Sequence, residues 1–241
     1  MKEEIKLFNE YVKNYDLKNK KLIGKYHHSF RVMEFCKEIA ISLNLNEEDI
    51  SIASLCGLLH DIARFEQLTK YDTYYDFKSF DHGDYGCDIL EHDDFIKKFT
   101  SDEEIIKIVL DGVRYHNKFK VPNLNERNML FVNILRDADK IDIMTEWANE
   151  IRDNKIILKE SILKSIYNKE LCKKSDLEND TDNILMNMSW IFDLNFKYSF
   201  EYLKNKKIIE KKFNLLEMYG ETKEISELKQ FIMKEIGEKL C

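Results

Sequence analysis

The sequence predicts an all-α protein, and three observations support this prediction. The chain has 241 residues of which 44% are apolar, enough to bury a core without a disulfide or a structural metal. It has only seven glycines and one proline, so the turn residues that a many-stranded sheet requires are scarce. Apolar residues recur at steps of three and four along most of the chain, as they do on the buried faces of helices.

Composition also narrows the classes of function. The formal net charge of -7 argues against a general affinity for nucleic-acid backbone or for an anionic membrane. No window approaches the roughly 18 consecutive apolar residues of a spanning helix, and the acidic opening is unlike a secretory signal. We therefore expect a cytoplasmic protein that binds neither a nucleic-acid polymer nor a membrane.

No internal boundary is visible in the sequence. No linker rich in proline, glycine or serine divides the chain, so we predict a single all-α unit over residues 1–241. The last part of the chain is rich in lysine and glutamate, but its apolar residues fit one or two helices that pack against the body. These residues are Ile208, Phe213, Leu216, Ile225, Leu228, Phe231 and Ile232.

All six histidines lie in the first half of the chain, which places any chemistry there. They are His27, His28, His60, His82, His92 and His116. Helical spacing puts His28 on one face with Val32, Cys36 and Ile39, so His28 is expected to point inward. We interpret His27 and His92 as ordinary core or surface histidines.

His60 and Asp61 lie within a segment that is apolar on nearly all sides. The acidic start at residues 46–49 and the apolar run that follows predict one helix continuing through about residue 65, buried in the middle of the domain. A carboxylate in such a place costs several kcal/mol unless it is paired or coordinates a metal. Asp61 therefore needs a partner, and Arg64, three residues further on, is the nearest cation in sequence.

Three further side chains occur at inward positions of predicted helices. His82 opens a helix, His116 ends the apolar stripe through Val109 and Val113, and Asp139 shares a face with Asp142. One such residue alone would be weak evidence. Four histidines and two aspartates on five successive stripes predict a metal site.

The same residues carry a family resemblance. The chain resembles the HD-domain metal-dependent phosphohydrolases in the segments HHSFRV at 27–32, GLLHDIARFEQ at 57–67, FDHGDYG at 80–86, RYHNK at 114–118 and RDADKID at 136–142. It is most similar to the subset with two additional histidines, which holds two metals. The resemblance implies an HD-domain helical bundle with its metal-binding core at residues 24–145 and a helical extension at residues 146–241.

The resemblance also implies a ligand set. One ion would be bound by His28, His60, Asp61 and Asp139, and a second by His82 and His116, with Asp61 bridging. Ligands of this kind, without thiolate, suit Fe, Mn, Co, Ni or Mg. The implied reaction is hydrolysis of a phosphoester or phosphoanhydride of a small, nucleotide-like substrate by water activated at the metal.

The metal ions would not neutralise all of the negative charge of a phosphate substrate, so positively charged side chains are also expected at the site. Arg31, Arg64 and Lys140 lie close in sequence to predicted ligands and are the expected phosphate contacts. Arg64 would stabilise the transition state, since arginine does not give up its proton in proteins. Several relatives, notably the HD-GYP group, carry lysine at the position of Arg64, and no GYP signature follows here. A cyclic-dinucleotide phosphodiesterase is therefore less favoured.

Three alternatives stay open on sequence grounds. One is a one-metal nucleotidase in which His82 and His116 only orient the substrate. Another is a di-iron HD-fold oxygenase, and the third is a non-catalytic nucleotide-binding module. The extension could cap the active-site cleft or form the face of a homodimer.

Overall fold

The computed structural model describes residues 1–146, 155–220 and 222–240. Within these ranges the secondary structure consists of α-helices and short 3-10 helices without any strand, which confirms the predicted all-α fold. The chain divides into two compact units, residues 1–142 and 143–241. This boundary lies three residues from the predicted end of the metal-binding core at residue 145. Folding of the whole chain as a single unit stays a prediction.

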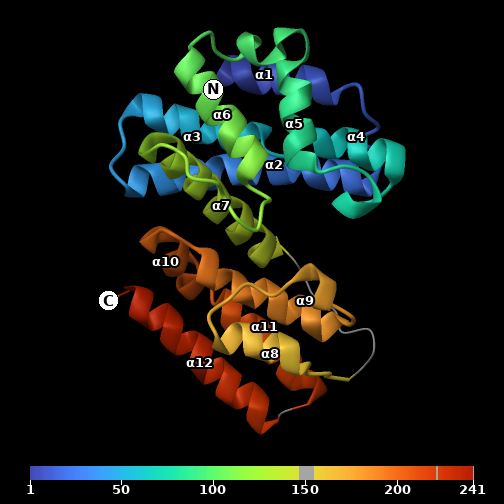
Figure 1. Ribbon diagram of the computed structural model, residues 1–241, viewed down its shortest axis with the longest axis vertical. Coiled ribbons are helices and arrows are strands. Elements are labelled where there is room, and N and C mark those ends of the chain that lie inside the picture. The colour runs from blue at the N-terminus through green and yellow to red at the C-terminus, as the bar shows by residue number, and fades with distance from the viewer. Residues whose placement is uncertain (147–154, 221, 241) are drawn as a thin grey trace. The chain divides into compact units, whose positions relative to one another are not determined.

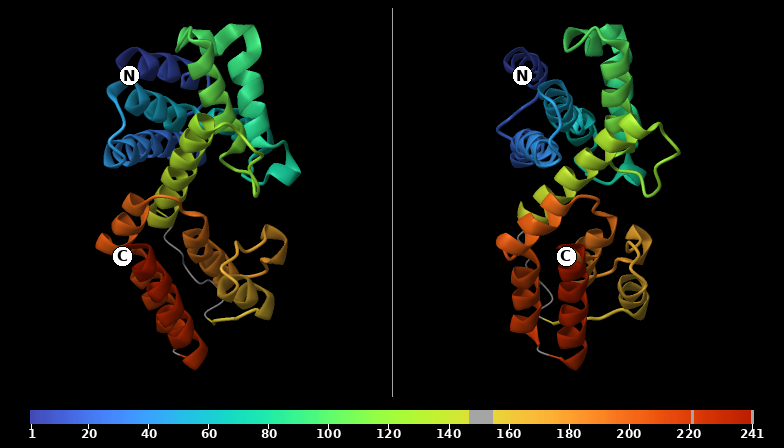
Figure 2. Two further views of the ribbon diagram at one scale, coloured as in Figure 1. Left: turned by 60° about the vertical axis from the view of Figure 1, so that its left-hand side comes forward. Right: turned by 90° about the vertical axis from the view of Figure 1, so that its left-hand side faces the viewer.

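The N-terminal unit contains seven α-helices, the last of which runs past its boundary, within the part of the chain that the structure describes (Figure 1). They are α1 (Lys2–Val12), α2 (Lys20–Ser42), α3 (Glu47–Leu59), α4 (Ile62–Tyr71), α5 (His82–Glu91), α6 (Glu103–Tyr115) and α7 (Glu126–Glu146). Two 3-10 helices, η1 (Asp76–Lys78) and η2 (His92–Lys98), flank α5 in sequence. Figure 2 shows α7 as one long helix in both of its views.

The helix α3 packs against both α2 and α6, and a glycine makes its approach to α2 possible. A Cβ atom added at Gly57 would lie 2.7 Å from the Cα of Met33, closer than real Cβ atoms come. A larger residue would therefore push the two helices apart. The close approach brings the end of α3, where His60 lies, to the helix that carries His28.

The expected single helix through His60 and Asp61 is wrong, because the helix breaks at these two residues. Helix α3 ends at Leu59 and α4 begins at Ile62, with Asp61 at φ -106° and ψ 22°. Consecutive residues of one α-helix point about 100° apart, so an unbroken helix would direct the two side chains differently. The break allows both to be buried, with His60 0% and Asp61 2% exposed.

A second close approach joins α5 to α6. Asp81 caps the start of α5 by accepting hydrogen bonds from the backbone N–H groups of Gly83 and Asp84. A Cβ atom at Gly83 would lie 2.7 Å from the carbonyl oxygen of Arg114, near the end of α6. The glycine thus lets the beginning of α5 lie on the end of α6, which places His82 beside His116.

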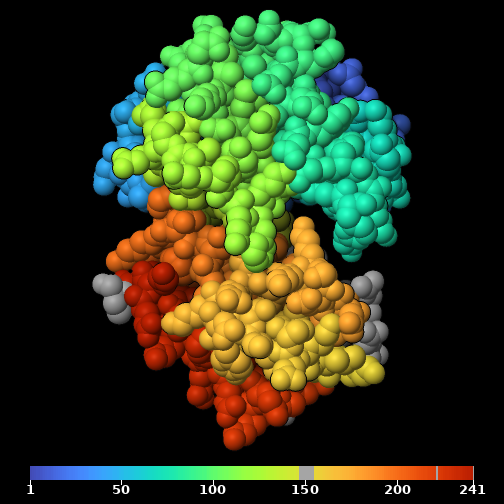
Figure 3. Space-filling view, in the orientation of Figure 1, coloured from blue at the N-terminus to red at the C-terminus, as the bar shows by residue number. Residues whose placement is uncertain are grey.

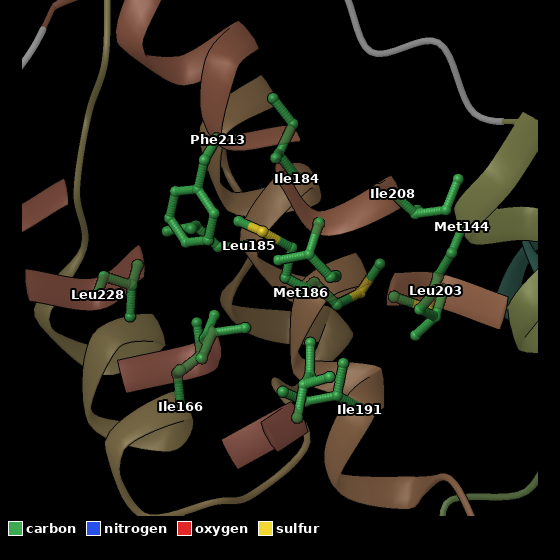
Figure 4. Packing of buried hydrophobic residues seen from close by; sticks show 14 of the residues in the cluster. Met144, Ile166, Ile184, Leu185, Met186, Ile191, Leu203, Ile208, Phe213 and Leu228 are labelled. Carbon is green, nitrogen blue, oxygen red and sulfur yellow. The ribbon is translucent and has the colours of Figure 1, made fainter. Parts of the chain in front are cut away.

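The C-terminal unit has a core of its own. Its helices are α8 (Glu160–Tyr167), η3 (Lys174–Asp176), α9 (Asp180–Ser189), η4 (Trp190–Asp193), α10 (Lys197–Asn205), α11 (Ile208–Tyr219) and α12 (Lys223–Leu240). Figure 4 shows the core, in which Phe213 and Leu228 pack with residues of α8 and α9. Ile225 and Ile232 belong to the same core, and Phe231 packs against it, so these predicted apolar positions are used within this unit.

No helix among the described residues is both long enough and apolar enough to cross a membrane.

Candidate metal centre

All six predicted metal ligands meet in the N-terminal unit. His28 comes from α2, His60 and Asp61 from the break between α3 and α4, His82 from the start of α5, His116 from the end of α6, and Asp139 from α7. The four histidines and Asp61 are each at most 5% exposed, and the side chain of Asp139 is 17% exposed.

One group of ligands, which we call half-site A, consists of His28, His60 and Asp139. The Oδ1 of Asp139 lies 3.1 Å from Nε2 of His28 and 3.6 Å from Nε2 of His60. The Oδ2 of Asp61 lies 3.4 Å from each of these two nitrogens. Half-site A therefore offers two imidazoles and two carboxylate oxygens around one point.

The other group, half-site B, consists of His82 and His116. Their Nε2 atoms lie 3.0 Å apart. The Oδ1 of Asp61 lies 3.5 Å from Nε2 of His82 and 3.8 Å from Nε2 of His116. Asp61 thus presents one oxygen to each half-site, as a bridging carboxylate does.

In each half-site, one histidine is oriented by a backbone carbonyl. The Nδ1 atom of His60 lies 2.7 Å from the carbonyl oxygen of Gly57, and that of His116 lies 2.7 Å from the carbonyl oxygen of Val113. A carbonyl only accepts, so Nδ1 donates and the Nε2 of a neutral ring carries the lone pair. Arg136 fixes the end of α6 by donating to the carbonyls of Tyr115, His116 and Lys118.

Two carboxylates orient the other two histidines in the same way. The Nδ1 of His28 lies 2.6 Å from Oδ2 of Asp142, and that of His82 lies 2.7 Å from Oδ2 of Asp76. Carboxylates placed behind imidazoles are typical of metal-binding histidines, because they fix the ring and raise its basicity. All four Nε2 atoms point inward, where facing lone pairs repel unless a proton or a metal ion lies between them. The donor set therefore fits a divalent ion.

The two half-sites differ in their electrostatics. Burial and Lys25 lower the pKa of His28, but hydrogen bonds with Asp139, Asp142 and Asp61 outweigh them and raise it to about 10. Burial likewise lowers the pKa of His60, and the neighbouring Asp61 and Asp139 raise it above its usual value. At pH 7, half-site A therefore holds a proton on His28 in the absence of a metal.

Half-site B shows the opposite shift. Burial and the charge of Arg64 lower the pKa of His82 to about 4, although Asp76 acts to raise it. Burial also lowers the pKa of His116, against its hydrogen bond with Asp61. Both rings are therefore neutral at pH 7.

The three predicted phosphate-binding cations occupy different places. Arg31 forms a two-pronged ion pair with Asp142, with Nε 2.6 Å from Oδ1 and Nη2 3.0 Å from Oδ2. Its guanidinium thus holds the carboxylate that orients His28. The ammonium of Lys140 is 3.3 Å from the carbonyl oxygen of Arg136 in its own helix. A role for either residue at the phosphate stays a prediction.

Arg64 lies beside half-site B. Its Nε is 3.5 Å from Oδ1 of Asp61, and its Nη2 is 3.3 Å from Nε2 of His82. Its Nη1 is held by Gln67, by Asp76 and by the carbonyl of Tyr74. The geometry thus contains the Asp61–Arg64 pair that the sequence suggested and also sets the guanidinium next to the ligands.

Sequence reasoning missed Lys25. Its ammonium lies 2.5 Å from Oδ2 of Asp61 and 5.6 Å from the centre of the Tyr74 ring. A signal was available for Lys25, which precedes His28 by three residues and so shares its helix face. Tyr74 and Asp76, in contrast, lie in the connection from α4 to α5, where no helical period indicates direction.

Comparison with known families agrees with this geometry. Residues 26–144 match the family model of the HD domain. No curated protein and no solved structure is significantly similar to the chain. The chain thus carries an HD domain, as its motifs predicted, and the buried histidine and aspartate groups of this domain could hold metal ions.

Proposed function

We propose that this protein is a metal-dependent phosphohydrolase that cleaves a phosphoester or phosphoanhydride bond of a small, nucleotide-like substrate. One observation carries the proposal. The buried carboxylate of Asp61 directs one oxygen to the imidazoles of half-site A and the other to those of half-site B. Such an arrangement suits two divalent ions that share one ligand.

This arrangement supports the ligand set that the family resemblance implied for two ions. His28, His60, Asp139 and Oδ2 of Asp61 would hold one ion, and His82, His116 and Oδ1 of Asp61 the other. Nitrogen and carboxylate ligands suit Fe, Mn, Co, Ni or Mg. When bound, such ions stabilise the charge of a phosphoryl group and lower the pKa of water.

The residues of the chain contribute position and charge. Asp142 and Asp76 each accept a hydrogen bond from Nδ1 of an imidazole, which directs Nε2 of His28 and Nε2 of His82 toward the expected metal positions. Arg64 holds a permanent positive charge beside half-site B, where it favours the charge that develops on a transferring phosphoryl group. Arg64 cannot serve as the general acid, because arginine stays protonated.

An aromatic ring supports the nucleotide part of the proposal. The ring of Tyr74 lies 5.6 Å from the ammonium of Lys25 and 5.9 Å from the guanidinium carbon of Arg64. Tyr74 is 40% exposed, so its ring is open to a ligand. An aromatic face between two cations suits a planar base joined to a phosphate. In Figure 3 the teal segment, α4 with the residues after it, forms one edge of the N-terminal unit.

The test is hydrolysis of nucleotides, cyclic nucleotides, dinucleoside polyphosphates and sugar phosphates, each with Mn, Co, Ni, Mg and Fe, with the products separated by chromatography. We expect hydrolysis of at least one nucleotide class and its loss on chelation. Asp61→Ala should abolish hydrolysis while circular dichroism shows that the protein remains folded. A folded, metal-loaded protein that hydrolyses none of these substrates would contradict the proposal. Oxygen consumption by the iron-loaded protein would favour the oxygenase alternative.

A one-metal nucleotidase is the second candidate, and half-site B is the reason. Half-site B has no carboxylate of its own beyond the shared Oδ1 of Asp61, and Arg64 already approaches Nε2 of His82. His82 and His116 would then bind the substrate instead of an ion. Metal analysis of the purified chain separates the candidates, with two ions per chain expected for the leading proposal and one for the alternative.

A further inference from the structure

We propose that Lys25 is a built-in competitor of the metal in half-site A, whose ammonium must leave Oδ2 of Asp61 before an ion can bind there. This inference rests on the proposed metal centre and concerns how that centre controls its own occupancy.

The ammonium and the ion require the same oxygen. Nζ of Lys25 is 2.5 Å from Oδ2 of Asp61, the oxygen that lies 3.4 Å from Nε2 of both His28 and His60. The side chain of Asp61 is 3% exposed and that of Lys25 is 15% exposed, so water screens the pair little. A divalent ion at the same oxygen would lie close to the ammonium and repel it.

Lys25 has a clear role while the metal is absent. Its ammonium pairs with the carboxylate of Asp61, whose side chain is 3% exposed. Lys25 thus supplies the partner charge that a buried carboxylate requires.

The displaced ammonium also has a place to go. Lys25 lies over the ring of Tyr74, which is 40% exposed, and lysine has a flexible four-carbon stem. Rotation of this stem can move Nζ from Asp61 toward the ring and solvent while the backbone of α2 stays in place. Metal binding then exchanges one cation for another at Asp61, and affinity is lower than the ligand set alone would give.

The test is a titration of the metal-free full-length chain with Mn²⁺ or Co²⁺, read by calorimetry or by competition with a chromophoric chelator. We expect Lys25→Met to bind the first ion more tightly than wild type, on the order of tenfold or more. The matched control is Lys21→Met, because Lys21 lies one turn earlier on α2 and pairs with Asp72 at 2.6 Å. It should bind like wild type. Unchanged or weaker binding by Lys25→Met would overturn the inference.

Two additions keep the test decisive. Lys25→Gln removes the charge but retains a hydrogen-bond donor for Asp61, so it replaces Lys25→Met should that variant not fold, and it should also bind more tightly. Without metal, both variants should unfold at a lower temperature than wild type and gain more from added metal. A wild-type chain that binds no metal would refute the proposed function itself, whereas wild-type binding with unaltered variants refutes only the role of Lys25.

Discussion

The two half-sites share one carboxylate and use the same type of histidine ligand, yet the pKa values of their histidines are shifted in opposite directions. Around half-site A, Asp139, Asp142 and Asp61 raise the pKa of His28 to about 10. Around half-site B, burial and Arg64 lower the pKa of His82 to about 4. Both half-sites have a carboxylate behind one imidazole, Asp142 in A and Asp76 in B. The difference therefore comes from the inner carboxylate Asp139 and from Arg64.

The comparison shows that ligand type alone does not set metal affinity. An ion in half-site A meets two carboxylates but must displace the proton of His28 and the ammonium of Lys25. An ion in half-site B meets neutral imidazoles, but it meets only one oxygen of the shared carboxylate, and the guanidinium of Arg64 lies 3.3 Å from Nε2 of His82. We expect half-site A to fill first and more tightly, because both half-sites offer two imidazoles but only half-site A has the additional carboxylate of Asp139, which attracts an ion strongly at short range in a buried site.

The largest effect is expected from Asp61→Ala, because it removes the ligand that both half-sites share. Loss of the bridge should lower the rate of substrate hydrolysis by at least about 10³-fold, equivalent to several kcal/mol of transition-state stabilisation. Metal analysis should find fewer than two ions per chain, with the circular dichroism spectrum unchanged. If Asp61→Ala retained both ions and full activity, the shared-ligand description of the centre would be wrong.

The next largest effect is expected in the pH dependence of metal affinity, which should differ between the two half-sites. The pKa of His28 is raised to about 10 in the metal-free protein, so below that pH an incoming ion must displace its proton. Affinity of half-site A should therefore rise with pH, up to about tenfold per pH unit for each proton released. The pKa of His82 is about 4, so affinity of half-site B should stay nearly constant between pH 6 and 8.

Calorimetry in two buffers of different ionisation enthalpy measures these protons directly. The first ion should release at least one proton at pH 7, and the second should release close to none from its histidines. Equal proton release for both ions would show that the electrostatic contrast between the half-sites does not exist.

Substitution of Asp142 and Asp76, the carboxylates that orient His28 and His82, tests the difference between the half-sites without changing an expected ligand. Asp142→Asn should weaken binding in half-site A by about 10- to 100-fold, as loss of such partners does elsewhere, and leave half-site B nearly unchanged. Asp76→Asn should do the reverse. Each variant serves as the control for the other in a metal titration. A loss of equal size at both half-sites in either variant would mean that the two histidine sets bind as one unit.

The inward direction of three expected ligands was predictable because helical periodicity fixes the direction of side chains. His28, His116 and Asp139 each continue an apolar stripe, and the structure brings them together. The break at His60 and Asp61 was not predictable. A segment that is apolar on all sides has no phase, so its pattern cannot show where the backbone turns.

The cations were harder to place than the ligands. Lys25 and Asp61 are 36 residues apart, and only the packing of α2 and α3 around Gly57 brings them together. Arg31 was expected at the phosphate because it lies near His28 in sequence, yet its guanidinium pairs with Asp142, 111 residues away. Ion pairs of this kind depend on tertiary structure, whereas sequence spacing reports only on neighbours in one helix.

The smallest expected effect is on thermal stability. The rise in unfolding temperature should be larger when half-site A fills than when half-site B fills. An ion that binds only the folded chain stabilises it by RT ln(1 + [L]/Kd), about 2.7 kcal/mol at a concentration of 100 Kd. For a protein of this size that corresponds to roughly 5 to 10 °C in the unfolding temperature. Filling half-site A should give most of this rise, and filling half-site B should add a smaller one, because its lower affinity gives a smaller [L]/Kd at the same concentration.

Asp76→Asn should remove only the smaller second rise, and Asp142→Asn should reduce the first. The measurement is a scan of unfolding temperature against Mn²⁺ concentration at pH 7, followed at a signal of the N-terminal unit. A single rise that both variants reduce equally would mean that the ions bind together, as a pair held by Asp61. In that case the bridge, and not the charge difference between the half-sites, would govern occupancy of the centre.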